Sequence, residues 1–131
     1  MAIKFLSPEY EEKLRELLKE DFSKPSSLTT TFCQIILGCP DGKDRWVLYG
    51  VEKGIMSDFK IGEGEPPEAN YRVRGPYQVY VDLIQGKYDG KTSLITGKLK
   101  LEGNMTRALG LLGAYTRIEK NQKSIDTDFA L

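Results

Sequence analysis

The fold is decided by Thr96-Gly97-Lys98-Leu99-Lys100-Leu101-Glu102-Gly103-Asn104-Met105, in which an alternation of polar and apolar residues meets a helix start. Leu99 and Leu101 point to one side of an extended chain, and the charged residues between them point to the other. Asn104 is a favoured N-cap, so a helix is expected to begin directly after the strand. The segment predicts a half-buried strand over residues 96–102 that leads into a helix without a loop.

The helix expected over residues 106–118 is apolar around most of its circumference. At 100° per residue its apolar arc covers roughly 220°, far more than the stripe of a surface helix. Such a helix lies deep in the protein or walls an apolar cavity. Gly110 and Gly113 share the remaining arc, where they clear space for a ligand or a close backbone contact, or are tolerated imperfections. The residues of the apolar arc are Met105, Ala108, Leu109, Leu111, Leu112, Ala114, Tyr115 and Ile118.

An amphipathic helix is expected near the N-terminus. Ser7 is a favoured N-cap and Pro8 suits the first helical position. Lys24-Pro25 ends the helix. One side carries charged residues, so the other side is expected to pack on a sheet. That apolar side repeats at helical spacing and consists of Tyr10, Leu14, Leu17 and Leu18.

The middle of the chain is rich in strand signals. Residues 29–37 are apolar on both faces, which is typical of a central strand. Turn residues at 40–42 lead into a second strand over 45–51, so the pair predicts a hairpin. A third antiparallel strand is expected over 55–61. The residues expected on its one face are Ile55, Ser57, Phe59 and Ile61.

The next segments alternate between loop, strand and helix. Residues 62–68 are expected to form a loop because they are rich in glycine and proline, and 69–74 a short strand. Pro76 opens a helix that Gly86 ends, and one helical turn is expected near residues 92–95. The helix after Pro76 presents one apolar face, made by Tyr77, Tyr80, Val81 and Ile84.

Composition excludes several classes of function. The 131 residues carry 19 basic and 19 acidic side chains, so the net charge gives no attraction to nucleic acid or to an anionic membrane. No apolar run approaches the ~20 residues of a membrane span, and the start of the chain is not a signal peptide, so we expect a cytoplasmic protein. Cys33 and Cys39 would lie about 20 Å apart on one extended segment, beyond disulfide reach, and are expected to be buried thiols.

No catalytic or metal-binding motif is recognised. Histidine is absent, so no base with a pKa near neutrality is expected. Residues 86–92 resemble a phosphate-binding loop, but three residues separate the glycines where that motif needs four. Asp58, Asp82 and Glu102 are expected on solvent faces. We therefore expect no cofactor, no metal and no nucleic-acid partner. A basic patch for lipid head groups, or ordinary outward-facing strand charge, is expected at Arg72, Arg74, Lys98 and Lys100.

Several motifs resemble the sterol carrier protein type 2 family, a small lipid-binding domain. The run from Gly97 to Met105, followed by Ala108-Leu109, is similar to that family's Gly-Lys-Leu-x-Ile-x-Gly-[Asn/Asp]-Met signature between a strand and a helix. Residues 80–86 resemble its pattern of an aromatic residue, then Leu, then Gly. Trp46 preceding Gly54 resembles its Trp-to-Gly stretch between two strands.

The resemblance implies an α/β (α+β) fold with a five-stranded, mostly antiparallel sheet and helices packed on one face. It covers about residues 28–118 of a single domain spanning 1–131, with 119–131 as a C-terminal tail. It also implies an apolar tunnel between the sheet and the helices. The residues expected to line this tunnel and bind a ligand are Phe32, Ile36, Tyr80, Val81, Ile84, Leu99, Leu101, Met105, Leu109 and Leu112.

Two functions follow from this interpretation. A non-enzymatic carrier would hold a fatty acid, fatty acyl-CoA, phospholipid or sterol-like lipid in the tunnel and touch membranes at most transiently. An interaction or dimerisation module, as a homodimer for example, would fill the tunnel with side chains and expose an apolar edge. An enzyme is the least favoured alternative. The residues that motivate the module are Tyr77, Tyr80 and Tyr115 near the expected tunnel, and Ile125, Phe129 and Leu131 in the tail.

Overall fold

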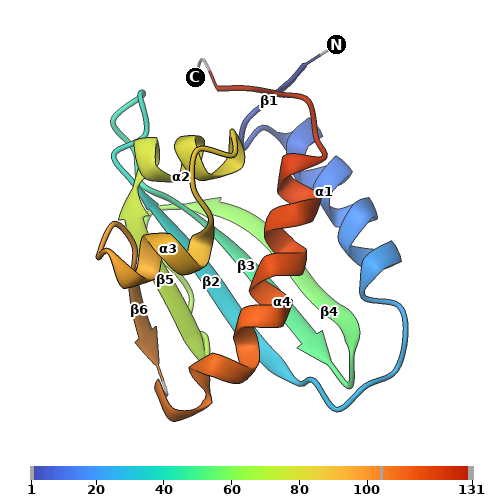
Figure 1. Cartoon of the computed structure of the whole chain (residues 1–131). Coiled ribbons are helices and arrows are strands. Elements are labelled where there is room, and N and C mark those ends of the chain that lie inside the picture. The colour runs from blue at the N-terminus through green and yellow to red at the C-terminus, as the bar shows by residue number, and fades with distance from the viewer. Residues whose placement is uncertain (1, 104, 130–131) are drawn as a thin grey trace.

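The computed structural model describes residues 2–103 and 105–129, and along 105–112 it describes the path of the backbone but not the side chains. A five-stranded sheet in the order β4-β3-β2-β5-β6 forms one layer, and the helices cover one of its faces (Figure 1). β2 and β5 pair in parallel and the other neighbours are antiparallel. The expected fold class is confirmed. The strands are β2 (Thr30–Leu37), β3 (Arg45–Glu52), β4 (Ile55–Glu63), β5 (Tyr71–Pro76) and β6 (Lys100–Gly103).

β2 is the central strand, as its two apolar faces predict. β3 pairs with it on one side and β5 on the other, so both of its edges are covered. Phe32, Gln34 and Ile36 alternate with Cys33 and Ile35, and all of these side chains are buried. Both cysteines of the chain are free and buried, as expected.

The start of β4 corrects the predicted strand pattern. The β3–β4 register shifts between Gly50 and Val51, which places Met56 opposite Val51. Met56 therefore packs against the core, whereas Ile55 is 45% exposed. The expectation that Ile55 shares a face with Phe59 is wrong, because a bulge changes the side to which the preceding residues point.

β4 also extends into the expected loop over residues 62–68. Gly62 pairs with Trp46 and Glu63 with Arg45, so the strand ends at Glu63. A Cβ on residue 62 would overlap the Trp46 ring. Because Gly62 has no side chain, the indole can lie across the strand, and this glycine marks a close approach rather than the start of a loop.

The beginning of β5 is tied to β2 by side-chain hydrogen bonds. Asn70 Oδ1 accepts from both the backbone amide and the hydroxyl of Thr31, each at 3.0 Å. The backbone amide of Asn70 donates to Thr31 Oγ1 at 2.8 Å. These bonds hold the two strands in register where the chain returns from β4, and Tyr71 and Val73 then face the core.

α1 (Pro8–Asp21) is the expected N-terminal helix. Ser7 is its N-cap, and Ser7 Oγ accepts from the Tyr10 amide at 3.2 Å. Tyr10, Leu14 and Leu18 are fully buried, whereas Leu17 is half-buried. The helix packs against β4 and α4 (Met105–Lys123). It ends at Asp21, three residues before the predicted stop at Lys24.

Replacing Ser7 with alanine is expected to lower the free energy of unfolding by about 1 kcal/mol, because the Tyr10 amide loses its acceptor. Urea unfolding followed by circular dichroism measures this difference. Ser23→Ala is the matched control: Ser23 Oγ donates to Glu20 O at the other end of α1, and its removal should cost less than about 0.5 kcal/mol. Equal stability of the two variants would contradict the capping role of Ser7.

The helices α2 (Tyr77–Ile84) and α3 (Gly90–Ile95) follow β5. Pro76 is the N-cap of α2, and the four residues predicted to share its apolar face are buried. The helical turn expected near residues 92–95 is part of α3. Asp89 is the N-cap of α3, and its Oδ1 accepts a hydrogen bond from the Thr92 amide at 2.7 Å.

β6 is shorter than the strand predicted over residues 96–102. Thr96 ends α3, and Gly97 has a φ of +79°, a left-handed conformation that glycine adopts without steric cost. The Leu99 amide donates to Ser93 O at 3.1 Å, so α3 rather than a neighbouring strand holds Leu99. The predicted inward positions are confirmed: Leu99 is buried and Leu101 is half-buried.

α4 begins directly after β6, as predicted. Asn104, its expected N-cap, lies outside the described residues. The helix continues to Lys123 instead of ending at Ile118, because residues beyond Ile118 extend its buried face. Gly113 is exposed and a Cβ there would meet nothing within 4 Å, which argues against a close backbone contact. The side chains of 105–112, which include Gly110, are outside the described set.

The first and last strands of the described chain lie side by side (Figure 1). β1 (Ile3–Lys4) pairs in parallel with β7 (Thr127–Asp128). The Phe129 ring packs on Phe5 with 5.1 Å between ring centroids, and the Tyr77 hydroxyl donates to Phe129 O at 2.7 Å. Ile125 is buried. The expectation that the tail exposes an apolar edge is therefore wrong for Ile125 and Phe129, and Leu131 lies outside the described residues.

Candidate functional site

The predicted tunnel residues with described side chains belong to one apolar core between the sheet and the helices. Leu101 is half-buried against that core, and the others are buried. Met105, Leu109 and Leu112 fall on the part of α4 whose side chains are not described. The buried residues come from β2, from α2 and from the approach to β6, and they are Phe32, Ile36, Tyr80, Val81, Ile84 and Leu99.

Tyrosines make up a large part of this core. The Tyr80 hydroxyl donates to Val73 O at 2.8 Å, which joins α2 to β5. Tyr115, on α4, contacts Phe32 edge-on with 5.2 Å between ring centroids. The Tyr49 ring also contacts Phe32, with 6.0 Å between ring centroids. The aromatic rings thus continue from the predicted tunnel residues towards the C-terminal half of α4.

A buried polar cluster lies beside these rings, and the sequence interpretation did not predict it. Tyr49 OH donates to Gln34 Oε1 at 2.6 Å. Gln122 Nε2 donates to Gln34 Oε1 at 3.0 Å and to Tyr49 OH at 3.1 Å. These three side chains join β2, β3 and α4 inside the core. We use the name buried polar cluster for Gln34, Tyr49, Tyr115, Glu119 and Gln122.

Glu119 is the carboxylic acid of the buried polar cluster and is only 4% exposed. Burial raises the pKa of its carboxyl to about 7, while Lys123 and a hydrogen bond from the Gly90 amide act in the opposite direction. The expectation that no base has a pKa near neutrality is therefore wrong. A helical repeat continued past Ile118 would have placed Glu119 and Gln122 on the buried side of α4.

Gly90 allows α3 to approach this carboxylate. A Cβ on residue 90 would overlap both the Glu119 carboxylate and the Tyr115 ring. The close approach brings the N-terminal residue of α3 against α4 and shields Glu119 from solvent. This contact joins residues that are far apart in the sequence, so no local sequence pattern predicts it.

Several polar atoms of the buried polar cluster have no hydrogen bond of standard geometry. Both donors and acceptors are included, and in most proteins such atoms are paired. The arrangement can accept and donate hydrogen bonds to a small group in the core. Among the described residues, no group of three or more His, Cys, Asp or Glu side chains comes together that could hold a metal ion. The atoms without a hydrogen bond of standard geometry are Gln34 Nε2, Tyr115 OH, Glu119 Oε1 and Gln122 Oε1. The Gln34 side chain still acts on the Tyr115 hydroxyl as a hydrogen-bond partner, and the Gly90 amide does so on Glu119, which leaves Gln122 Oε1 as the atom of this set without any partner.

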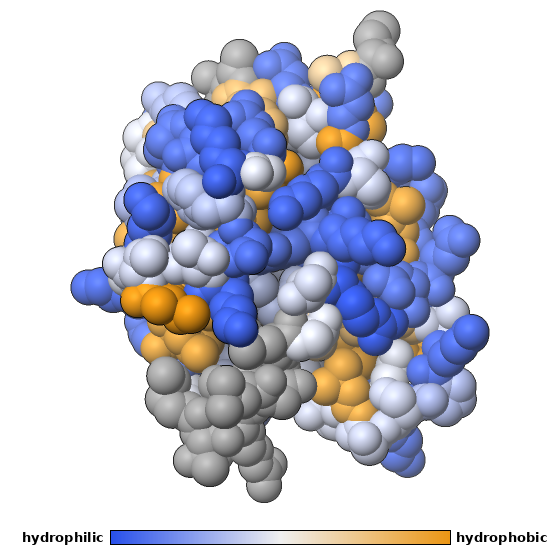
Figure 2. Space-filling view, in the orientation of Figure 1, coloured by the Kyte–Doolittle hydropathy of each residue, from blue (hydrophilic) through white to orange (hydrophobic). Residues whose placement is uncertain are grey.

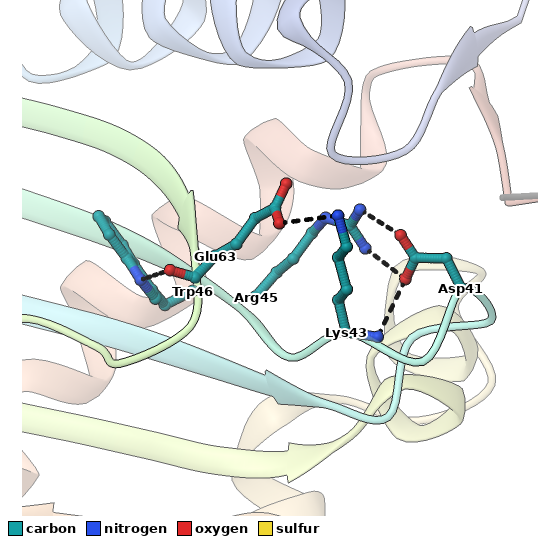
Figure 3. Close-up of polar contacts among 5 residues, drawn as sticks. All are labelled: Asp41, Lys43, Arg45, Trp46 and Glu63. Atoms are coloured by element: carbon teal, nitrogen blue, oxygen red, sulfur yellow. Dashed lines mark hydrogen bonds and ion pairs between the residues drawn. The ribbon is translucent and has the colours of Figure 1, made fainter.

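A separate open pocket of about 440 Å³ lies where α1 begins beside the β2–β3 turn. Arg45 makes two hydrogen bonds to Asp41, at 3.0 and 2.6 Å, and holds the pKa of that carboxyl at about 2 (Figure 3). Lys43 pairs with Glu63 at 3.3 Å. Because these charges neutralise one another, the pocket has no concentration of one charge that would select a ligand.

The face of the molecule that carries the helices is mainly hydrophilic, with apolar residues in small separate areas (Figure 2). Ile95 on α3 is 75% exposed. Within the described chain, no helix combines the length and the apolar character needed to cross a bilayer.

Comparison with solved structures shows the same fold. A crystal structure of sterol carrier protein 2 matches with a TM-score of 0.78 and 17% identity, over 93% of this chain and 99% of that one. A conserved hypothetical protein of Thermus thermophilus matches with a TM-score of 0.76 and 16% identity, over 97% of this chain and 93% of that one. A palmitated sterol carrier protein 2-like protein of Aedes aegypti matches with a TM-score of 0.55 and 15% identity, over 88% of this chain and 95% of that one.

Comparison at the level of sequence identifies the family. None of the curated proteins matches the chain. The model of the SCP-2 sterol transfer family matches residues 30–114, which run from β2 into α4. This match covers more than half of the chain and includes the strand-to-helix signature at residues 97–105. The chain therefore belongs to the SCP-2 sterol transfer family.

Proposed function

We propose that this protein binds an apolar lipid between its sheet and its helices and carries it through the cytoplasm without chemical change. The observation that carries the proposal is the family match over residues 30–114, which includes α2, β6 and the first half of α4. The buried residues of β2 and α2 supply the apolar surface that an acyl chain needs. Each buried methylene contributes about 0.8 kcal/mol to affinity.

The proposed ligand contacts come from both layers. Phe32 and Ile36 contribute from β2, and Leu99 and Leu101 from the segment at β6. The three residues of α4 complete the set as predictions from sequence. Fatty acids, fatty acyl-CoA, phospholipids and sterol-like lipids all offer the required apolar chain or ring system. The proposed contacts on the helices are Tyr80, Val81, Ile84, Met105, Leu109 and Leu112.

Lipid extraction and titration test this function. Solvent extracts of the purified protein are analysed by mass spectrometry, and the delipidated protein is titrated with a fluorescent fatty acid. We expect micromolar binding, after the cost of association is subtracted. Ile84→Trp, which fills a buried position, should weaken binding at least tenfold, whereas Ile95→Trp at an exposed position should not. No binding at tens of micromolar by the folded wild-type protein would refute lipid carriage.

A protein-interaction module with a filled interior is the second candidate. It is favoured by the tyrosines that occupy the core, since Tyr10, Tyr49 and Tyr80 are among the largest fully buried side chains. Size-exclusion chromatography with light scattering separates the two candidates. A lipid-free dimer that takes up no fluorescent fatty acid supports the module, and a monomer that binds lipid supports the carrier.

A further inference from the structure

We propose that the buried polar cluster binds the polar end of the lipid, and that it selects a small uncharged hydroxyl head group over a charged one. The proposal rests on the lipid-carrier function above and adds to it an orientation and a ligand class. A lipid alcohol would lie with its hydroxyl inside the core beside α4 and its apolar part along β2 and α2.

The first argument is the burial of the polar side chains. Gln34 is 0% exposed, Gln122 2%, Glu119 4% and Tyr115 5%, and each has a side-chain atom without a hydrogen bond of standard geometry. Leaving a buried donor or acceptor unpaired costs about 1–3 kcal/mol. Gln34 acts on Tyr115 and the Gly90 amide acts on Glu119 as hydrogen-bond partners, so Gln122 Oε1 is the atom left without any partner. A ligand group that donates to Gln122 Oε1 recovers this cost.

The second argument is position. Phe32, a predicted tunnel residue, contacts the rings of Tyr49 and Tyr115. Tyr115 follows closely on the segment 105–112 of α4, which carries the remaining predicted tunnel residues. The buried polar cluster therefore adjoins the proposed apolar site, and a lipid lying there reaches the cluster with one of its ends.

The third argument is the chemistry of these polar atoms. Gln122 Oε1 is an acceptor without a partner. Tyr115 OH has the Gln34 side chain as a hydrogen-bond partner and, as a hydroxyl, can both donate and accept. A hydroxyl group both donates and accepts, so it can satisfy a donor and an acceptor at once. An anionic head group only accepts hydrogen bonds, and it would leave Gln122 Oε1 unpaired.

The fourth argument is charge. The groups that act on Glu119 are Lys123 on its own helix, Asp89 at the N-cap of α3, and the Gly90 amide. The members of the buried polar cluster that come from the sheet, Gln34 and Tyr49, carry a neutral amide and a neutral phenol. Lys123 is exposed, so no buried cation of the described residues compensates an anion beside Glu119. An ionised Glu119 would repel an anionic head group, and a protonated one would not.

Competition between ligands of equal chain length tests the proposal. The delipidated protein is loaded with diphenylhexatriene, an apolar probe without a head group, which is displaced by 1-decanol or by decyl sulfate. Decyl sulfate stays anionic at all the pH values used, so Glu119 is the group that titrates. At pH 8 we expect decanol to bind at least tenfold more tightly than decyl sulfate. At pH 6 the affinity for decyl sulfate should rise severalfold, because Glu119 takes up a proton and no longer repels the sulfate.

Two variants and a control make the test specific. Glu119→Gln should abolish the pH dependence of decyl sulfate binding. Gln122→Leu should weaken the binding of decanol about tenfold and leave the binding of diphenylhexatriene unchanged. Gln78→Leu on the exposed side of α2 should change neither ligand. If Gln122→Leu does not fold, Glu119→Gln, which keeps the size of the side chain, decides alone.

The outcomes separate this proposal from lipid carriage itself. If the wild-type protein binds the probe and both ligands equally, and the variants change nothing, the head-group assignment is wrong and lipid carriage stands. If the folded wild-type protein binds none of the three compounds, lipid carriage is wrong as well. Tighter binding of decyl sulfate than of decanol at pH 8 would also overturn the head-group assignment.

Discussion

Tyr80→Ala is expected to lower the free energy of unfolding by about 4 kcal/mol, the largest effect predicted for this protein. Tyr80 is 1% exposed and is among the largest fully buried side chains. Its removal leaves a cavity in the core and takes away the hydrogen bond to Val73 O, which joins α2 to β5. The loss of the ring and the loss of the bond both act against the folded state.

Tyr80→Phe separates the two contributions. Phenylalanine keeps the ring and removes the hydroxyl, so we expect a loss of about 1 kcal/mol. Urea unfolding of both variants and of the wild-type protein, monitored by circular dichroism, gives the comparison. If Tyr80→Ala cost no more than Tyr80→Phe, the ring would not be an integral part of the core. Because Tyr80 is also a predicted ligand contact, both variants are measured without lipid.

Glu119→Gln is expected to make stability less dependent on pH, by about 2 kcal/mol between pH 5 and pH 8. In the folded protein burial raises the carboxyl pKa from 4.5 to about 7. Between these values the folded state holds a proton that the unfolded chain has released. The wild-type protein therefore loses stability as the pH rises towards 8. One pKa unit corresponds to about 1.4 kcal/mol, and solvent screening reduces the total to about 2 kcal/mol.

Thermal and urea unfolding of both proteins at several pH values measure this effect. Glutamine cannot titrate, so Glu119→Gln should gain stability relative to the wild-type protein as the pH rises through 7. Glu16→Gln, at an exposed position of α1, is the control and should follow the wild-type profile. A constant difference between Glu119→Gln and the wild-type protein from pH 5 to pH 8 would show that Glu119 keeps an ordinary pKa.

Much of the fold could be predicted because its signals are local. The spacing of Tyr10, Leu14 and Leu18 predicted the buried face of α1, and Ser7 predicted where it begins. The apolar character of residues 29–37 on both faces predicted that β2 is central. Each of these features depends on backbone periodicity or on a cap within a few residues, so neighbouring sequence is sufficient to recognise it.

The errors arose where contacts distant in the sequence override a local pattern. The bulge near the start of β4 turned Ile55 outward, and no residue near it signals the shift. The Trp46 ring over Gly62 kept a glycine-rich stretch in a strand. α4 passed its predicted end because its last turns pack inside the molecule, which also changed the tail from an exposed edge into part of the core.

The candidate site divides in the same way. The sequence by itself determined the elements, their apolar faces and the strand-to-helix signature from Gly97 to Met105, because alternation, helical spacing and end-capping act between near neighbours. Only the tertiary structure decided that Gln34, Glu119 and Gln122 share the core. A charged or amide side chain is buried there because α3 meets α4 at Gly90 and α4 lies over β2 and β3, and these contacts join residues that are far apart in the chain.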